Sequence, residues 1–319
     1  MKILVLGGGI AGLTTAHTVL ERGYNAVTLM AAAWPPDIVS SVAAAVWYPY
    51  KVDHPDVSAW GRASFARFAE FAATEPASGV RMVRGVEYRN ADDTQAPAWA
   101  SAVEEFQILR GEAVPPPFQS AFSFRVPIIE TPRYLAWLRQ RVEKGGANFI
   151  ERHVDSLAEI ADEYEAIFNC TGLGARALVG DETLYPIRGQ IVKLAAGGDD
   201  GFHLVQEEHE STNSTYIIPR SDGVICGGTA EPNVWATDID EAISTGILAR
   251  AVALRPELAA RPVLETRVGL RPARPTVRLE VERLRDCVLC HNYGHGGAGV
   301  TLSWGCAAAI VDQFEDAIG

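Results

Sequence analysis

The chain has 319 residues, of which 48% are hydrophobic and 21% are charged, and its formal net charge is −12. This composition is ordinary for a globular protein with a large buried core, and the length predicts about two domains. The acidic balance argues against nucleic acid and against anionic membranes as partners, because both bind clustered Lys and Arg. A small-molecule substrate fits better.

The N-terminal residues and the cysteines favour a cytoplasmic protein. The apolar run 3–6 ends at Gly7 and is too short for the core of a signal peptide. No apolar stretch reaches the length of about 18 residues that a membrane helix needs. Five cysteines, an odd number in a chain of this size, indicate reduced thiols. The sequence leaves the oligomeric state open, so a homo-oligomer is compatible with it.

One cysteine pair has an alternative interpretation. Cys287, Cys290 and His291 form a Cys-x-x-Cys-His pattern, which can attach haem covalently or contribute to a metal site. Haem attachment would require export, and a zinc site would need another cysteine pair. We therefore interpret 287–290 as a buried apolar strand and predict no metal.

The beginning of the chain carries a dinucleotide-binding pattern. An apolar strand expected over 2–6 leads into Gly7-x-Gly9-x-x-Gly12, and a helix is expected to follow as far as Gly23. Gly7 permits a tight turn, Gly9 lets a pyrophosphate approach the backbone, and Gly12 lets the helix pack closely on the strand. The N-terminus of the helix would then face the phosphates with its free N–H groups.

The second strand departs from this pattern. It is expected over 26–30 and should end in an acidic residue that binds the adenosine ribose, but the next residues are Ala31, Ala32 and Ala33. The ribose would have to be held by backbone groups, by water or by a residue from elsewhere. The departure weakens the case for NAD and leaves FAD open.

Small residues follow at 40–46. Such a segment suits the approach to a flat ring, and Ser40 and Ser41 could donate hydrogen bonds to phosphate, although a plain buried strand is an equal alternative. A helix is expected from Thr131, with Pro132 in its first turn, and a buried strand over 166–169 leads into a loop with Gly172.

These patterns predict an α/β fold in which a Rossmann-like domain is interleaved with a mostly antiparallel α+β domain. We expect the first domain to comprise 1–46, 131–180 and 281–319, and the second to comprise 47–130 and 181–280.

Near the C-terminus, four glycines occur in the six residues 294–299. Glycine adds no side chain to a core, so the run favours a loop whose main chain approaches a ligand.

Seven motifs follow one another along the chain: Gly7-x-Gly9-x-x-Gly12, Val42-Ala43-Ala44 with Trp47-x-Pro49-Tyr50, Asn169-Cys170-Thr171-Gly172, Arg188-Gly189-Gln190, Tyr216-Ile217-Ile218-Pro219, Gly269-Leu270-Arg271-Pro272-x-Arg274-Pro275 and His291-Asn292-Tyr293-Gly294-His295-Gly296-Gly297. In these motifs and in their order, the chain resembles the D-amino-acid oxidase family over nearly its whole length.

The resemblance implies an FAD enzyme that removes hydride from the Cα of a D-amino acid and returns the electrons to oxygen, giving a 2-oxo acid, ammonia and hydrogen peroxide. It places Arg271 and Tyr216 against the substrate carboxylate and the carbonyl of Gly297 toward the amine. A planar guanidinium suits the first role, because it binds a carboxylate bidentately. For His291 and His295 we expect a role in stabilising the loop.

The cofactor-binding positions that the resemblance implies are Gly7, Gly9, Ile10, Ala11, Gly12, Ser40, Ser41, Ala44, Ala45, Val46, Trp47, Val154, Cys170, Thr171, Gly172, Arg271, Gly296, Gly297, Gly299, Val300 and Thr301.

The preferred substrate is expected to be a neutral D-amino acid, with basic side chains tolerated and acidic ones disfavoured. The family's active-site lid corresponds to 206–215, where Thr212 stands in place of a second tyrosine and three glutamates occur. D-Aspartate oxidases of the family carry an arginine where this chain has Ala230. The acidic lid would repel acidic substrates, although a solvated charge run is the more common explanation of such glutamates.

Three alternatives remain open at this point. A flavin oxidase acting on glycine or N-methylated amino acids would use the same fold. A dehydrogenase would pass electrons to a carrier in place of oxygen. A non-catalytic dinucleotide-binding sensor would bind the nucleotide without turnover.

Overall fold

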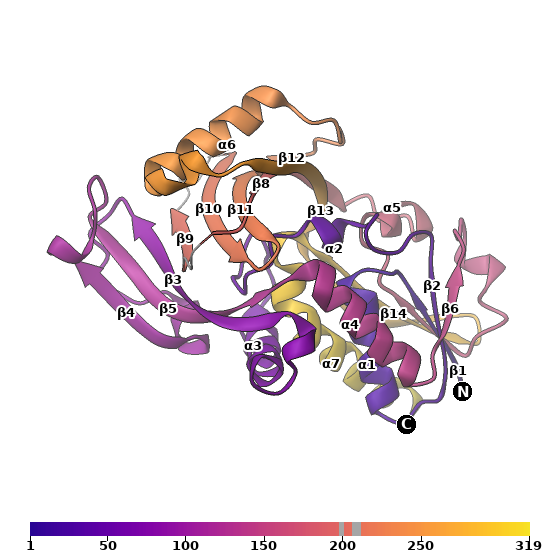
Figure 1. The fold of residues 1–319 in the computed structure, drawn as a ribbon. Coiled ribbons are helices and arrows are strands. Elements are labelled where there is room, and N and C mark those ends of the chain that lie inside the picture. The colour runs from indigo at the N-terminus through magenta and orange to yellow at the C-terminus, as the bar shows by residue number, and fades with distance from the viewer. Residues whose placement is uncertain (198–200, 206–211) are drawn as a thin grey trace.

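The computed structural model describes residues 1–197, 201–205 and 212–319. Its strands form one sheet with helices on both faces (Figure 1). The helices are α1 (Ile10–Glu21), α2 (Val39–Val42), α3 (Val57–Thr74), α4 (Thr131–Lys144), α5 (Ala175–Leu178), α6 (Glu241–Leu254) and α7 (Gly299–Ile318). The strands are β1 (Lys2–Leu6), β2 (Ala26–Ala31), β3 (Val80–Arg89), β4 (Glu104–Arg110), β5 (Ser120–Ile129), β6 (Asn148–Glu151), β7 (Ala166–Asn169), β8 (Tyr185–Leu194), β9 (Phe202–Val205), β10 (Asn213–Arg220), β11 (Gly223–Thr229), β12 (Glu231–Pro232), β13 (Val263–Leu284) and β14 (Cys287–His295).

One half of the sheet is parallel. Its order is β14-β7-β1-β2-β6, and each neighbouring pair in this run is parallel. The carboxyl ends of all five strands therefore meet at one edge, the usual ligand-binding edge of an open α/β sheet. Helices α1, α4 and α7 pack against one another beside this half (Figure 1). Strand β1, in the middle of this run, is buried on both faces, which explains its continuous apolar run.

The other half is mostly antiparallel. It continues from β13 through β8, β11, β10, β9, β3, β5 and β4, and only the β3–β9 pair is parallel. Strand β13 joins the halves, because it is 22 residues long and pairs with β8 along one part and with β14 along another. Helix α6 covers β8, β10 and β11, whereas α3 packs against β3, β5 and α7 (Figure 1).

The expected mixed α/β fold with an antiparallel second part is confirmed. The first helix begins at Ile10, earlier than expected, because Gly9 serves as its N-cap and only Gly12 of the glycine motif lies in its first turn. Helices α3 and α6 were not predicted individually. We propose that 1–46, 131–180 and 281–319 form the nucleotide-binding domain, since these ranges contain all five parallel strands, and that 47–130 and 181–280 form the substrate-binding domain.

The cysteine prediction is confirmed. All five thiols are free and buried, and Cys287 and Cys290 lie on the buried strand β14. Among the described residues, no group of ligand side chains could hold a metal ion. No described helix is long and apolar enough to cross a membrane.

Candidate active site

A cavity of about 520 Å³ runs from the carboxyl ends of the parallel strands to the face of the antiparallel strands. Most residues that the sequence singled out line this one cavity. They are Gly7, Gly9, Ile10, Ala11, Ser40, Ala44, Ala45, Val46, Val154, Cys170, Thr171, Gly172, Tyr216, Arg271, Gly296, Gly297, Gly299, Val300 and Thr301.

Three expected cofactor residues do not line the cavity. Gly12 lies under the glycine turn, where a Cβ atom would come within 1.9 Å of the Gly7 carbonyl oxygen. Trp47 is buried in the core, and its indole N–H donates to the Gly61 carbonyl at 3.0 Å. Ser41 is buried behind the cavity wall. All three lie directly beneath lining residues, so a role in supporting the wall fits them better than direct contact.

The glycine turn leaves backbone donors open to a phosphate group. Gly7 has φ +119°, which a side chain would strain, and a Cβ atom there would lie 2.3 Å from the Cys170 carbonyl oxygen. The Ile10 N–H donates to Ser40 Oγ at 3.0 Å, so the Ser40 hydroxyl proton remains available to donate to a ligand. The buried Ser41 Oγ has no hydrogen-bond partner among the described residues.

The end of the cavity beside β2 carries residues that sequence reasoning missed. Ala31, Ala32 and Ala33 line it, as expected, without a carboxylate. Asp37, Arg152 and His153 also line the cavity, and the Arg152 N–H donates to the Ala31 carbonyl at 2.9 Å. The short turn after β2 and the parallel pairing of β2 with β6 bring these side chains here. Nothing in the local sequence signals that pairing.

The wall between the two ends is built from backbone. Thr301 Oγ1 donates to the Tyr48 carbonyl at 2.9 Å and accepts from the Tyr48 N–H at 3.1 Å, which ties α7 to the segment after β2. A Cβ atom at Gly296 would lie 2.0 Å from the Lys51 carbonyl oxygen, and one at Gly297 would lie 2.4 Å from the Tyr50 ring. The glycines at 294–299 therefore also have a packing role, which the sequence analysis did not predict. Their backbone still faces the cavity.

Arg271 and Tyr216 lie over glycines of neighbouring strands. A Cβ atom at Gly189 would come within 2.3 Å of the Arg271 guanidinium, and one at Gly227 would come within 2.0 Å of the Tyr216 ring. Gly189 and Gly227 thus let both side chains lie flat on the sheet at the cavity floor. A glycine inside a strand is the sequence signal for such close approach.

The Arg271 guanidinium is anchored on one side and open on the other. Nη1 donates to the Thr229 carbonyl at 2.9 Å and to the Arg188 carbonyl at 3.5 Å. Its Nη2 and Nε have no hydrogen-bond partner among the described residues. The Tyr50 ring lies 5.8 Å from the guanidinium carbon and orients it further. Two nitrogens of a half-buried arginine, Nη2 and Nε, therefore have N–H donors available to a carboxylate.

The rest of this end of the cavity is apolar. Its lining from β8, β9 and β10 includes Ile191, Phe202, Leu204 and Ile218. Leu204 lies opposite Tyr216 in the β9–β10 pairing. Among the described lining residues on these strands and β13, Arg271 is the only charged one.

Two buried histidines lie on β14 and bond to partners within the sheet, and their expected role in stabilising the following loop stays a prediction. His291 lies between Asn169 Nδ2 at 3.3 Å and Glu282 Oε1 at 2.9 Å, and burial lowers its pKa. His295 Nε2 lies 2.9 Å from Asn292 Oδ1, and burial lowers the pKa of His295 to about 4. Both imidazoles are neutral near pH 7, so neither is suited to act as a general acid at this pH.

These features fit a flavin dinucleotide. The Ser40 hydroxyl, the helix N-terminus and the glycine cradle suit a pyrophosphate, and the backbone wall at 296–301 leaves room for a flat ring. The family described as "FAD dependent oxidoreductase" matches residues 2–313. The chain belongs to this family. It is therefore an oxidoreductase whose cofactor is FAD.

Named relatives of this FAD dependent oxidoreductase match over nearly full length. The D-amino-acid oxidase of Rubrobacter xylanophilus is 44% identical over 309 residues, which cover 96% of this chain and 93% of the relative. The D-amino-acid oxidase of Streptomyces coelicolor is 40% identical over 308 residues, covering 96% and 94%. Among solved structures, glycine oxidase from Geobacillus kaustophilus superposes with a TM-score of 0.79 at 18% identity, covering 99% of this chain and 94% of that one. The last comparison supports the fold.

Proposed function

We propose that this enzyme oxidises neutral D-amino acids to 2-oxo acids, ammonia and hydrogen peroxide, with FAD as cofactor and oxygen as electron acceptor. The observation that carries the proposal is the open guanidinium edge of Arg271 on a cavity floor that is otherwise apolar. The names of the relatives from Rubrobacter xylanophilus and Streptomyces coelicolor support it.

In this proposal Arg271 binds the substrate carboxylate through Nη2 and Nε, since Nη1 is held by the Thr229 carbonyl. Tyr216 lies in the same cavity and donates its hydroxyl to the same carboxylate. Charge-assisted bonds of this kind are short and directional, so together they fix where Cα lies.

Gly297 supplies the third contact. Its carbonyl receives the substrate amine, and the Tyr50 ring packs closely against Gly297 and fixes the position of that carbonyl. FAD supplies the two-electron oxidation when it is bound. The protein's residues hold Cα and its hydrogen in line and exclude water, which is catalysis by orientation.

The side-chain preference follows from the lining. Ile191, Phe202, Leu204 and Ile218 offer hydrocarbon, and Ala230 provides no cation that could neutralise a second carboxylate. Burying an unpaired carboxylate in such surroundings is costly. The expected lid begins in residues 206–211, which lie outside the described part of the chain, so the tolerance of basic substrates rests on the sequence alone.

A panel of substrates tests the proposal. Peroxide formation should be faster with D-alanine, D-methionine and D-leucine than with D-aspartate or D-glutamate, while D-arginine and D-lysine should give intermediate rates. Faster turnover of D-aspartate would contradict the neutral preference. Faster turnover of glycine or sarcosine would favour the related amine oxidase activity, and rapid dye reduction with slow peroxide formation would identify another electron acceptor.

We also propose a cytoplasmic location, because five free, buried cysteines suit a reducing compartment. Cell fractionation tests this, and recovery of the enzyme outside the cytoplasm would contradict it.

A further inference from the structure

The anchored side of Arg271 depends on the position of one carbonyl. Thr229, at the end of β11, supplies the 2.9 Å contact to Arg271 Nη1, and the contact from the Arg188 carbonyl is longer at 3.5 Å. A shift of Thr229 would therefore turn the guanidinium and redirect its free N–H donors. The residues that hold Thr229 in place therefore also set the orientation of the Arg271 guanidinium.

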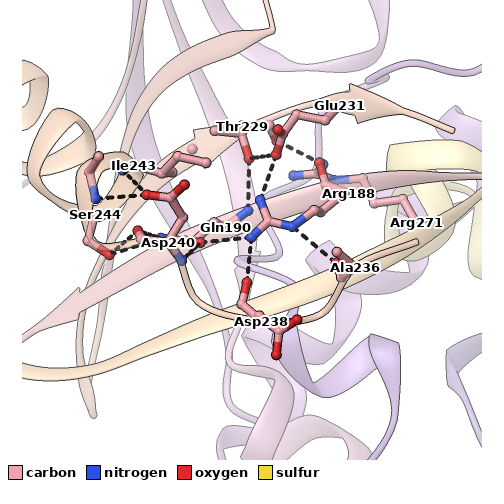
Figure 2. A network of polar contacts seen from close by, with 12 residues as sticks. Arg188, Gln190, Thr229, Glu231, Ala236, Asp238, Asp240, Ile243, Ser244 and Arg271 are labelled. Atoms are coloured by element: carbon pink, nitrogen blue, oxygen red, sulfur yellow. Dashed lines mark hydrogen bonds and ion pairs between the residues drawn. The ribbon is translucent and has the colours of Figure 1, made fainter. Parts of the chain in front are cut away.

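A buried ionic network lies behind this contact (Figure 2). Side chains alternate along a strand, and Gly189 and Ile191 of β8 line the cavity, so Arg188 and Gln190 point to the opposite face beneath α6. The Arg188 side chain is only 5% exposed and pairs with Glu231 at 2.6 Å. It also donates to the carbonyls of Ala236 and Asp238 and to Gln190 Oε1, at 3.1, 2.7 and 3.0 Å.

The Thr229 hydroxyl connects this network to the Arg271 anchor. Thr229 Oγ1 accepts from the Gln190 N–H at 3.0 Å and donates to Glu231 Oε2 at 3.3 Å. The same Glu231 oxygen accepts from Arg188. The residue whose carbonyl anchors Arg271 is thus fixed by its own side chain to a buried ion pair.

Gln190 extends the network to α6. Its amide Nε2 donates to the Asp240 carbonyl at 2.7 Å and to Ser244 Oγ at 2.9 Å, and its Oε1 accepts from the Asp240 N–H at 3.0 Å (Figure 2). Asp240 caps the helix by accepting from the N–H groups of Ala242 and Ile243. The network is therefore also held in place at its α6 end.

We propose that Thr229, Glu231 and Arg188 are positioning residues that set the orientation of Arg271 for the substrate carboxylate. The inference rests on the proposed function, in which Arg271 binds that carboxylate. In this inference, the network on the face of the sheet opposite the cavity sets the conformation of Arg271. The network itself does not touch the substrate.

Two possible roles of Glu231 predict opposite effects of its removal on carboxylate binding. If Glu231 acted only as a negative charge near the site, its removal would leave Arg188 uncompensated and strengthen carboxylate binding. If Glu231 acts by holding Thr229, its removal weakens carboxylate binding. The change Glu231→Met separates these effects, because it keeps the length of the side chain and removes both the charge and the oxygen that accepts from Thr229 Oγ1.

Benzoate is a suitable probe, since it has a carboxylate but neither an amine nor a hydrogen on the α-carbon. Its dissociation constant would be measured on the FAD-loaded enzyme by absorbance titration, beside kcat and KM for D-methionine and the dissociation constant of FAD. Thr229→Val removes only the hydroxyl, and Thr229→Ser keeps it. Asp222→Asn is the matched control, because Asp222 pairs with Lys193 of β8 and Arg220 of β10 away from the cavity.

We expect Thr229→Val and Glu231→Met to weaken benzoate binding and raise KM by about five- to tenfold, the effect of one lost hydrogen bond. FAD affinity should stay within about twofold, and Thr229→Ser and Asp222→Asn should resemble the wild type. Unchanged or tighter benzoate binding in Glu231→Met would overturn the inference, as would equal weakening in Asp222→Asn. If one of Thr229→Val and Glu231→Met does not fold, the other decides.

Arg271→Met distinguishes the two levels of the argument. Wild-type benzoate affinity in this variant would contradict the proposed function itself. Lost affinity in Arg271→Met, with wild-type affinity in Thr229→Val and Glu231→Met, would contradict the positioning role alone.

Discussion

The two ends of the cavity use glycine for opposite purposes. At the parallel end, Gly7 and Gly12 bring two stretches of main chain together, so that backbone N–H groups can face a ligand. At the antiparallel end, Gly189 and Gly227 let the side chains of neighbouring strands lie down on the sheet. In the proposed function, a glycine in the first set serves cofactor binding, and a glycine in the second set serves substrate binding. Substitutions in each set test this division.

Gly12→Ala should give the largest effect. The added Cβ would lie 1.9 Å from the Gly7 carbonyl oxygen, and backbone cannot move aside cheaply. We expect FAD affinity to fall by at least about 100-fold, corresponding to overpacking of about 3 kcal/mol. Fluorescence titration with FAD measures this. Gly246→Ala on α6 is the control, because its Cβ would meet only the tip of Arg250 at 3.4 Å, and it should leave FAD affinity unchanged.

The parallel half should also be the more sensitive of the two to acid. Burial lowers the pKa of His295 to about 4, below its ordinary value of about 6.5. The unfolded chain therefore binds a proton first as the pH falls, so stability is complete above pH 6.5 and falls by about 3 kcal/mol toward pH 4. Urea unfolding across this range measures the loss. His295→Gln keeps a donor for Asn292 Oδ1 and should flatten the profile; an equally steep profile would contradict this assignment.

Gly189→Ala should raise KM without affecting the flavin. The Cβ would displace the Arg271 guanidinium, which is the end of a flexible side chain and can shift, so we expect an increase of about 30-fold. Steady-state kinetics with D-methionine and FAD titration measure the two effects separately. A fall in FAD affinity like that in Gly12→Ala would show that the two glycine sets do not differ in purpose.

Tyr216→Phe should give the smallest effect. The ring would still lie over Gly227, and only the hydroxyl is lost. One hydrogen bond to a carboxylate contributes about 1.5 kcal/mol, which predicts an increase in KM of about tenfold. Tyr24→Phe, remote from the cavity against Phe314, is the control and should leave KM unchanged. A wild-type KM in Tyr216→Phe would remove this hydroxyl from the carboxylate site.

The two halves also differed in how far the sequence predicted them. The strand, glycine turn and helix at 2–21 are contiguous, so their local pattern predicts their contacts. The network around Arg188 joins β8, β11, β12 and the start of α6, which are far apart in the chain, and no local pattern fixes such pairing. Asp37 and Arg152 were not predicted as cavity-lining residues for the same reason. Helix α3 was missed although its buried Phe65, Phe68 and Phe71 recur every three residues, which is the spacing of a helix face and the signal that could have found it.

The central claim is that Arg271 holds the carboxylate of a D-amino acid beside FAD. Anaerobic addition of D-methionine to the purified, FAD-loaded enzyme tests it most directly. The flavin absorbance should bleach with D-methionine, stay unchanged with L-methionine, and bleach at least about 100-fold more slowly in Arg271→Met at the same substrate concentration. Equal bleaching by both enantiomers, or an unchanged rate in Arg271→Met, would contradict the account.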